Sequence, residues 1–146
     1  MRYWLLLALV VVAASCAAQF DVSFSTLMQG IHAQHERGEV VIRDSVAWHR
    51  LQEKLVSQVA PYPPAIDFEN EMIVAVFYGQ VESSGYKIDI DRVTETTHDV
   101  VVHVREEVPG NRCVVNGVLT YPYHVIRMKR LGKTVRFVRG KVEMPC

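Results

Sequence analysis

The chain has 146 residues, and 16 Lys and Arg side chains balance 16 Asp and Glu side chains, so its formal net charge at pH 7 is zero. This balance excludes the strongly basic surface that nucleic-acid binding requires. Once an N-terminal targeting segment is subtracted, the remaining length fits one ordinary domain with a hydrophobic core and leaves no room for a second.

The N-terminus has the pattern of a bacterial signal peptide. Arg2 supplies a positive charge, residues 5–12 form an apolar run too short to span a bilayer, and small residues follow at 13–15. Cys16 comes next, and residues 13–16 resemble the lipobox, in which the cysteine is acylated and becomes the new N-terminus. We therefore expect a signal peptide at residues 1–15, a lipid anchor on Cys16 and a tether over residues 16–22.

Ordinary cleavage is the alternative to lipidation. A larger aliphatic residue usually stands three positions before a lipobox cysteine, whereas this chain has Ala13, so cleavage after Ala17 or Ala18 also fits and would release a soluble secreted protein. Because Ala17 rather than Asp follows Cys16, the lipobox resemblance implies an outer-membrane lipoprotein that faces the periplasm.

Residues 23–142 are predicted to form one β-rich domain that opens with a hairpin. Apolar residues recur imperfectly over 23–31 and again over 39–43, which indicates two short strands. The polar, glycine-containing residues 35–38 between them favour a turn.

One helix is expected after this hairpin. Asp44 or Ser45 can cap its first turn, and the prolines at positions 61, 63 and 64 prevent it from running far past Gln58. Apolar residues with the spacing i, i+3 and i+7 predict its buried stripe: Trp48, Leu51 and Leu55.

The centre of the domain is predicted at residues 72–79. This run contains no charge and is rich in β-branched and aromatic residues, which is typical of a strand buried on both faces. Residues 86–90 alternate between apolar and polar, as in a half-buried strand. We expect the two strands to form a hairpin with an exposed tip at Ser83, Ser84, Gly85 and Tyr86.

Further strands are predicted at residues 100–105, 113–120, 123–129 and 134–138, separated by turns or loops. The basic residues near the end of the chain mostly alternate with apolar ones, which indicates the solvated face of a hairpin. The expected fold class is α+β: a mostly antiparallel sheet, curled towards a barrel or sandwich, with one packed helix.

Two cysteines lie in the predicted domain. In an oxidising compartment Cys113 and Cys146 can pair, which would close a loop of about thirty residues and stabilise the fold by about 3 kcal/mol. The alternative is that both remain thiols.

Motifs for catalysis and metal binding are weak. Ser84 and Lys87 have the Ser-x-x-Lys spacing, but in a strand a three-residue offset places the two side chains on opposite faces. His32 and His35 would form a metal pair only on a helix, and no further ligand is positioned to complete a site. We expect no enzyme activity, metal or cofactor; a Cys113 thiolate nucleophile is the enzymatic alternative.

Two blocks of sequence resemble a known family. Asp67 and Phe68 with residues 72–80 and 84–88 form the first block, and residues 119–126 form the second. Together they resemble the PrcB C-terminal family, named for a lipoprotein subunit of a bacterial secreted protease complex, over residues 66–128. In the turn, Ser83 and Ser84 stand where such proteins often carry Thr and Gly.

The resemblance implies an exported, membrane-tethered, non-catalytic protein that binds and stabilises a protein partner, by analogy a peptidase. Its partner surface is expected where amphipathic aromatic residues flank rigid turns. The predicted set is Ser83, Ser84, Gly85, Tyr86, Tyr121, Pro122, Tyr123 and His124. Alternatively, the tyrosine rings pack on the core.

A peptidase inhibitor is the competing functional hypothesis. The polar, polar, Gly, Tyr order at residues 83–86 is similar to the loop of chagasin-like inhibitors of cysteine peptidases.

Overall fold

The structure is a computed structural model that describes residues 18–55 and 63–146. The predicted signal peptide and the predicted lipidation site, Cys16, lie outside the described residues. Within the described residues, no helix is long and apolar enough to cross a membrane.

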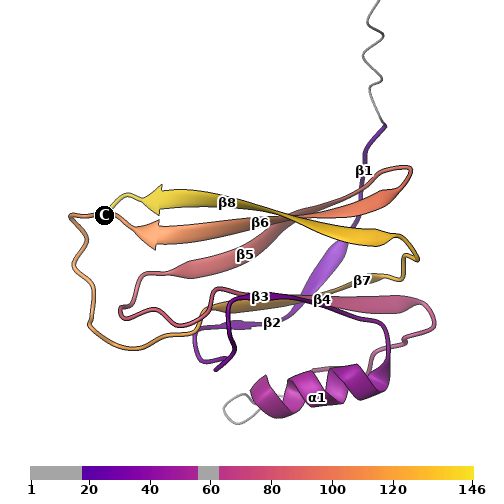
Figure 1. Ribbon diagram of the computed structural model, residues 1–146, viewed down its shortest axis with the longest axis horizontal. Helices are drawn as coiled ribbons and strands as arrows, with labels where there is room; N and C mark the ends of the chain where they lie inside the picture. The colour runs from indigo at the N-terminus through magenta and orange to yellow at the C-terminus, as the bar shows by residue number, and fades with distance from the viewer. Residues whose placement is uncertain (1–17, 56–62) are drawn as a thin grey trace, which may run out of the picture.

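The described residues form a sandwich of two four-stranded sheets, with one helix on the outer face of the second sheet (Figure 1). The first sheet has the order β1-β5-β6-β8, formed by Phe20–Asp21, Lys87–Glu95, Asp99–Pro109 and Thr134–Met144. The second sheet has the order β2-β7-β4-β3, formed by Phe24–Gly30, Tyr123–Lys129, Glu71–Phe77 and Gly38–Ile42. The predicted α+β class is confirmed, as an open sandwich rather than a closed barrel.

Helix α1 (Ser45–Leu55) begins where its cap predicts. The backbone N–H of Ala47 donates to Asp44 Oδ1 at 2.8 Å, which satisfies one of the unpaired donors of the first turn. The predicted stripe of Trp48, Leu51 and Leu55 is buried against the second sheet, so this prediction is confirmed.

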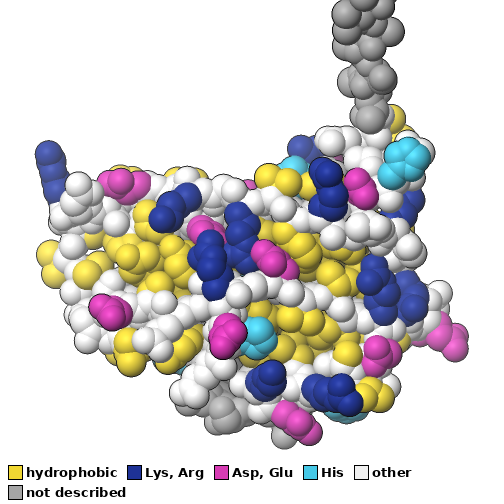
Figure 2. All heavy atoms as spheres, in the orientation of Figure 1, with side chains coloured by type: hydrophobic (Ala, Val, Ile, Leu, Met, Phe, Trp, Pro, Cys, Tyr) yellow, Lys and Arg dark blue, Asp and Glu magenta, His cyan; other side chains and the backbone are white. Residues whose placement is uncertain are grey.

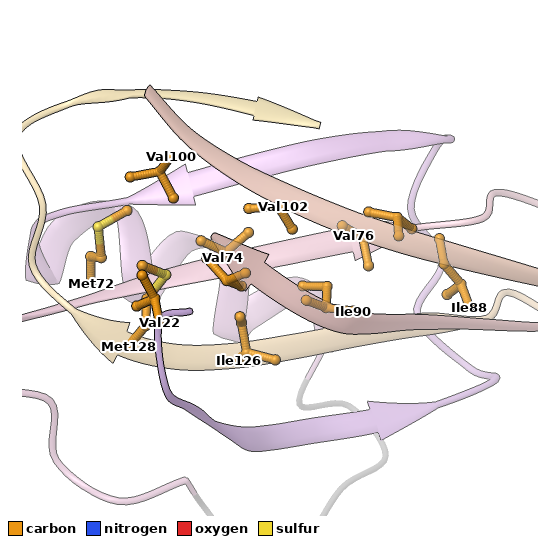
Figure 3. Close-up of a cluster of buried hydrophobic side chains, with 12 residues drawn as sticks. Val22, Met72, Val74, Val76, Ile88, Ile90, Val100, Val102, Ile126 and Met128 are labelled. Carbon is orange, nitrogen blue, oxygen red and sulfur yellow. The ribbon is translucent and has the colours of Figure 1, made fainter. Parts of the chain in front are cut away.

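Strand β4 separates two hydrophobic cores. Its residues 72–77 are no more than 1% exposed, as expected for a strand covered on both faces. Alternate side chains such as Val74 and Val76 face the first sheet, where they meet Val102 and Ile90 (Figure 3). The intervening side chains, such as Phe77, join the core beneath α1.

The predicted hairpins are wrong, because their strands pair with more distant partners. Strand β2 pairs with β7 and not with β3, and β4 and β5 lie in different sheets. Strand β4 has β3 on one side and β7 on the other, so no edge is left for β5. Residues 78–86 therefore cross the roughly 10 Å between stacked sheets.

The C-terminal part of the chain also departs from the prediction. Strands β7 and β8 lie in different sheets and form no hairpin; β8 runs parallel to β6. Strand β6 continues to Pro109, four residues beyond the predicted end. Residues 113–119, predicted as a strand, form an irregular loop, in which Asn116 exchanges hydrogen bonds with Ser84 of the crossover instead of pairing with a strand.

Candidate functional site

Three connections meet at one end of the sandwich, here called the loop end: residues 31–37, 78–86 and 110–122 (Figure 1, left). The crossover and the long loop exchange two backbone hydrogen bonds of 2.9 Å between Val81 and Thr120. The N–H of Tyr121 donates to the carbonyl oxygen of Ile31 at 2.8 Å. The two sequence blocks of the family resemblance therefore lie side by side.

A pocket of about 560 Å³ opens at the loop end, and its lining includes His35, Arg37, Tyr78, Gln80 and Tyr121. We call it the tyrosine pocket. It combines two aromatic rings, a guanidinium group and a side-chain amide, a set that can hold an aromatic or polar side chain of another protein.

The rings of the tyrosine pocket are held in place by their neighbours. The guanidinium carbon of Arg37 lies 5.1 Å from the centroid of the Tyr78 ring, a cation–π geometry. The Tyr86 ring meets the Tyr78 ring edge to face, with centroids 5.5 Å apart. The Tyr121 hydroxyl donates to Gln80 Oε1 at 2.8 Å. A partner would thus meet preorganised aromatic groups.

The buried carboxylate of Glu106 binds the guanidinium group of Arg37. Arg37 Nη2 donates to both oxygens of Glu106, at 2.7 and 2.9 Å, and Arg139 donates to the same carboxylate. Only 5% of the Glu106 side chain is exposed. Burial acts to raise the pKa of Glu106, but hydrogen bonds and charge from the two arginines outweigh it and hold the pKa below 4.5.

Arg139 also closes the side of the sandwich where β3 and β8 are the free edges. Its Nε atom lies 2.7 Å from Glu39 Oε1, and Nη2 donates to the Gly38 carbonyl oxygen at 3.1 Å. Figure 2 shows basic and acidic side chains lying together across the middle of this face. We call the group of Arg37, Arg139, Glu39 and Glu106 the arginine clasp.

The predicted hairpin tip is not free. Ser84 exchanges hydrogen bonds with Asn116, and the Ser83 carbonyl oxygen accepts from the Thr120 hydroxyl at 3.2 Å. Ser83, Ser84 and Tyr86 are half-buried, and of the predicted tip only Gly85 is exposed. The expectation of an exposed tip is wrong, because the crossover lies along the loop of residues 110–122.

The second predicted block divides into a surface part and a core part. Tyr121 is half-buried and lines the tyrosine pocket. Pro122, Tyr123 and His124 are buried, so they do not offer a surface to a partner. Tyr123 packs in the core beneath α1, as the alternative to the binding hypothesis predicts for a tyrosine ring.

His124 connects the two sheets. The Ile90 N–H donates to His124 Nδ1 at 2.9 Å, so the ring proton is on Nε2, which donates to Thr26 Oγ1 at 2.8 Å. A register shift between Ile90 and Arg92 accompanies this contact. Burial lowers the pKa of His124 below 6.5 and keeps the ring neutral. Its role is structural.

Cys113 and Cys146 form a disulfide, with their Cα atoms 5.2 Å apart. The bond ties the long loop to the end of the chain beyond β8. It also leaves no thiolate on Cys113, which removes the nucleophile of the enzymatic alternative. Among residues 18–55 and 63–146, no group of three or more His, Cys, Asp or Glu side chains is placed to hold a metal.

The sequence interpretation missed Arg37, Tyr78 and the exposed aliphatic residues near Val114. One signal was available for the first. Val100, Val102 and Val104 point into the sandwich, and Glu106 continues this alternation, so a charged partner had to meet it inside. No pattern in the sequence shows that Arg37 is that partner.

Comparison with known proteins found one family match. Residues 72–129 match the model of the PrcB C-terminal family. The matched region runs from β4 through the crossover and the long loop to β7, and the predicted resemblance is confirmed. This match fits a subunit associated with a protease complex. No curated protein and no solved structure showed a significant match.

Proposed function

We propose that the chain is an exported, lipid-anchored, non-catalytic protein that binds and stabilises a partner, by family resemblance a secreted peptidase. The observation that carries this proposal is the match of residues 72–129 to the PrcB C-terminal family. The matched segment supplies Tyr78, Tyr86 and Tyr121, which form or support the tyrosine pocket.

The geometry of the tyrosine pocket supports a binding role. Tyrosine and arginine are enriched among the residues that dominate protein interfaces, because they combine large contact area with polar ends. Here Arg37 and Tyr78 are fixed by Glu106 and Tyr86, so a partner would spend little entropy to order them.

Two observations support export. The N-terminal pattern is that of a signal peptide followed by Cys16, and the Cys113–Cys146 disulfide suits an oxidising compartment.

The test is affinity purification of the full-length chain from its native cell envelope. We expect a peptidase to co-purify with the wild type, and its yield to fall about tenfold with Tyr121→Ala, since hot-spot truncations cost 1–2 kcal/mol or more. Val46→Ser on the outer face of α1, where Val46 is 58% exposed, is the matched control and should leave the yield unchanged. Absence of any reproducibly enriched peptidase contradicts the proposal.

The same preparation separates binding from inhibition. The Tyr86 ring packs on Tyr78, so residues 83–86 are not free to insert into an active site as an inhibitory loop would. We expect no loss of thiol-peptidase activity when the chain is added. Inhibition that disappears with Tyr86→Ala would favour the chagasin-like alternative.

A further inference from the structure

The long loop carries an exposed apolar segment, residues 113–119, here called the apolar loop. Val114 is fully exposed, and Val118 and Leu119 are 48% and 54% exposed. No Asp, Glu, Lys or Arg occurs between residues 113 and 126, in a chain that is 22% charged. Figure 2 shows hydrophobic side chains gathered at this end of the molecule. Several aliphatic side chains so exposed in one uncharged segment mark an interaction site.

The apolar loop has no regular secondary structure, yet it is held at both ends and in the middle. The disulfide of Cys113 holds its start, and Thr120, paired with Val81, holds its end. In the middle, Asn116 donates to Ser84 Oγ at 3.0 Å and accepts from the Ser84 N–H at 2.9 Å. An apolar segment displayed in one fixed conformation can bind without first losing conformational entropy.

The apolar loop is continuous with the tyrosine pocket. Leu119 lies two residues before Tyr121, which lines the pocket, and the next residue, Thr120, donates from its hydroxyl to the Ser83 carbonyl oxygen of the crossover. A partner seated in the pocket would therefore meet the loop as well.

The position of the N-terminus favours a protein over a membrane as the occupant. Strand β1 pairs with residues 94 and 95, at the end of the first sheet where β6 begins, whereas the loop follows the other end of β6 (Figure 1). Eleven residues of β6 span about 33 Å. Phe20 is the fourth residue after Cys16, so the two lie about 14 Å apart at most. An anchor on Cys16 thus lies at the end of the domain opposite the loop.

We propose that the apolar loop is the docking surface for a folded protein partner that presents an uncharged, apolar surface of its own. This inference rests on the proposed function for the anchor and for the existence of a partner, but it assigns the contact to Val114, Val118 and Leu119.

The test places a photo-crosslinking amino acid, benzoylphenylalanine, at position 114 of the full-length chain in its native envelope. We expect one discrete protein adduct, and loss of most of it when Leu119→Ser is added. The same probe at position 46, also an exposed valine, should not give this adduct. Adducts with lipid only, with a second copy of the chain only, or equally from position 46 overturn the proposal.

The crosslinked protein is then purified and titrated with the full-length chain in detergent. Val118→Ser and Leu119→Ser should each weaken binding about tenfold, as for central apolar contacts, while Val46→Ser leaves it unchanged. Unchanged affinity in both loop variants overturns the inference. If a peptidase co-purifies but binds the loop variants as tightly as the wild type, only the inference about the loop fails. If the loop binds a protein that is not a peptidase, only the proposed function fails.

Discussion

At Gly79 the chain leaves β4 and turns towards the other sheet with a φ angle of +87°, in the left-handed region that favours glycine. A Cβ atom there would lie 3.0 Å from the backbone nitrogen of Arg37. Gly79 therefore allows the turn into the crossover, and it also lines the tyrosine pocket.

We expect Gly79→Ala to lower the free energy of unfolding by about 1–2 kcal/mol, from backbone strain and the contact with Arg37. Urea denaturation monitored by circular dichroism measures the change. Gly117→Ala is the control, because nothing lies within 4 Å of a Cβ atom at that position and its φ angle is not positive. Equal effects of the two substitutions would contradict this role of Gly79.

His124 should make the stability depend on pH below neutrality. In the folded state its pKa lies below 6.5, so between 6.5 and that lower pKa the unfolded chain binds more protons than the folded chain. Stability is full above pH 6.5 and falls as the pH decreases, by at most about 1.4 kcal/mol per pH unit.

Denaturation at pH 7.5, 6.5 and 5.5 measures this slope. The neutral side chain of His124→Gln can keep a hydrogen bond to Ile90, and we expect it to flatten the slope. His49→Gln on the exposed side of α1 should keep the wild-type slope. A slope that survives in His124→Gln assigns the pH dependence to another group.

At the scale of elements, the arginine clasp links β6, β8 and β3 through one buried carboxylate. Breaking a buried ion pair from one side leaves the partner charges uncompensated. Because Arg37 is half exposed and can regain water, we expect Glu106→Gln to cost about 2 kcal/mol, below the range for fully buried pairs.

The pH dependence provides a second check on the clasp. The Glu106 pKa is lowered, so its contribution is present above pH 4.5 and is lost as the pH falls through the folded-state pKa. Wild type and Glu106→Gln should therefore converge in stability at low pH. Glu39→Gln, which removes a more exposed carboxylate, should cost less than about 1 kcal/mol. A constant difference at all pH values would contradict the ion-pair explanation.

The elements that the sequence predicted well are those set by local rules. The Asp44 cap and the stripe from Trp48 to Leu55 depend on neighbours within two turns, and α1 was found with both. Strand β7 was predicted with the bounds it has in the structure, because Pro122 precedes it and the turn residue Gly132 follows soon after it.

What the sequence could not show is which strands pair. Periodicity reports the buried face of a strand, but not its neighbour, so β4 and β5 looked like a hairpin although they belong to opposite sheets. The residues of the candidate site could be predicted only in part, for the same reason. Tyr86 and Tyr121 were found at the loop end, whereas Arg37 reaches it only through the position of β3 next to β4.

At the scale of the whole molecule, the proposed lipid anchor on Cys16 would set the direction in which the loop end faces. We expect Cys16→Ser to release the protein from the membrane fraction, because the described domain contains no helix able to span a bilayer. Fractionation of cells expressing wild type and variant, with immunoblotting, measures the distribution. Continued membrane association of the variant would refute lipidation as the anchor.

The parallel pairing of β8 with β6 has a consequence for folding. Strand β6 is an interior strand only because β8 covers it, and β8 follows all the other described strands in sequence order. During synthesis, before β8 has been made, β6 presents an open edge along all its eleven residues. Such an edge can pair with a strand of another chain. The first sheet is complete only once β8 has paired with β6, so loss of residues 134–144 would produce aggregation-prone chains rather than a smaller working domain.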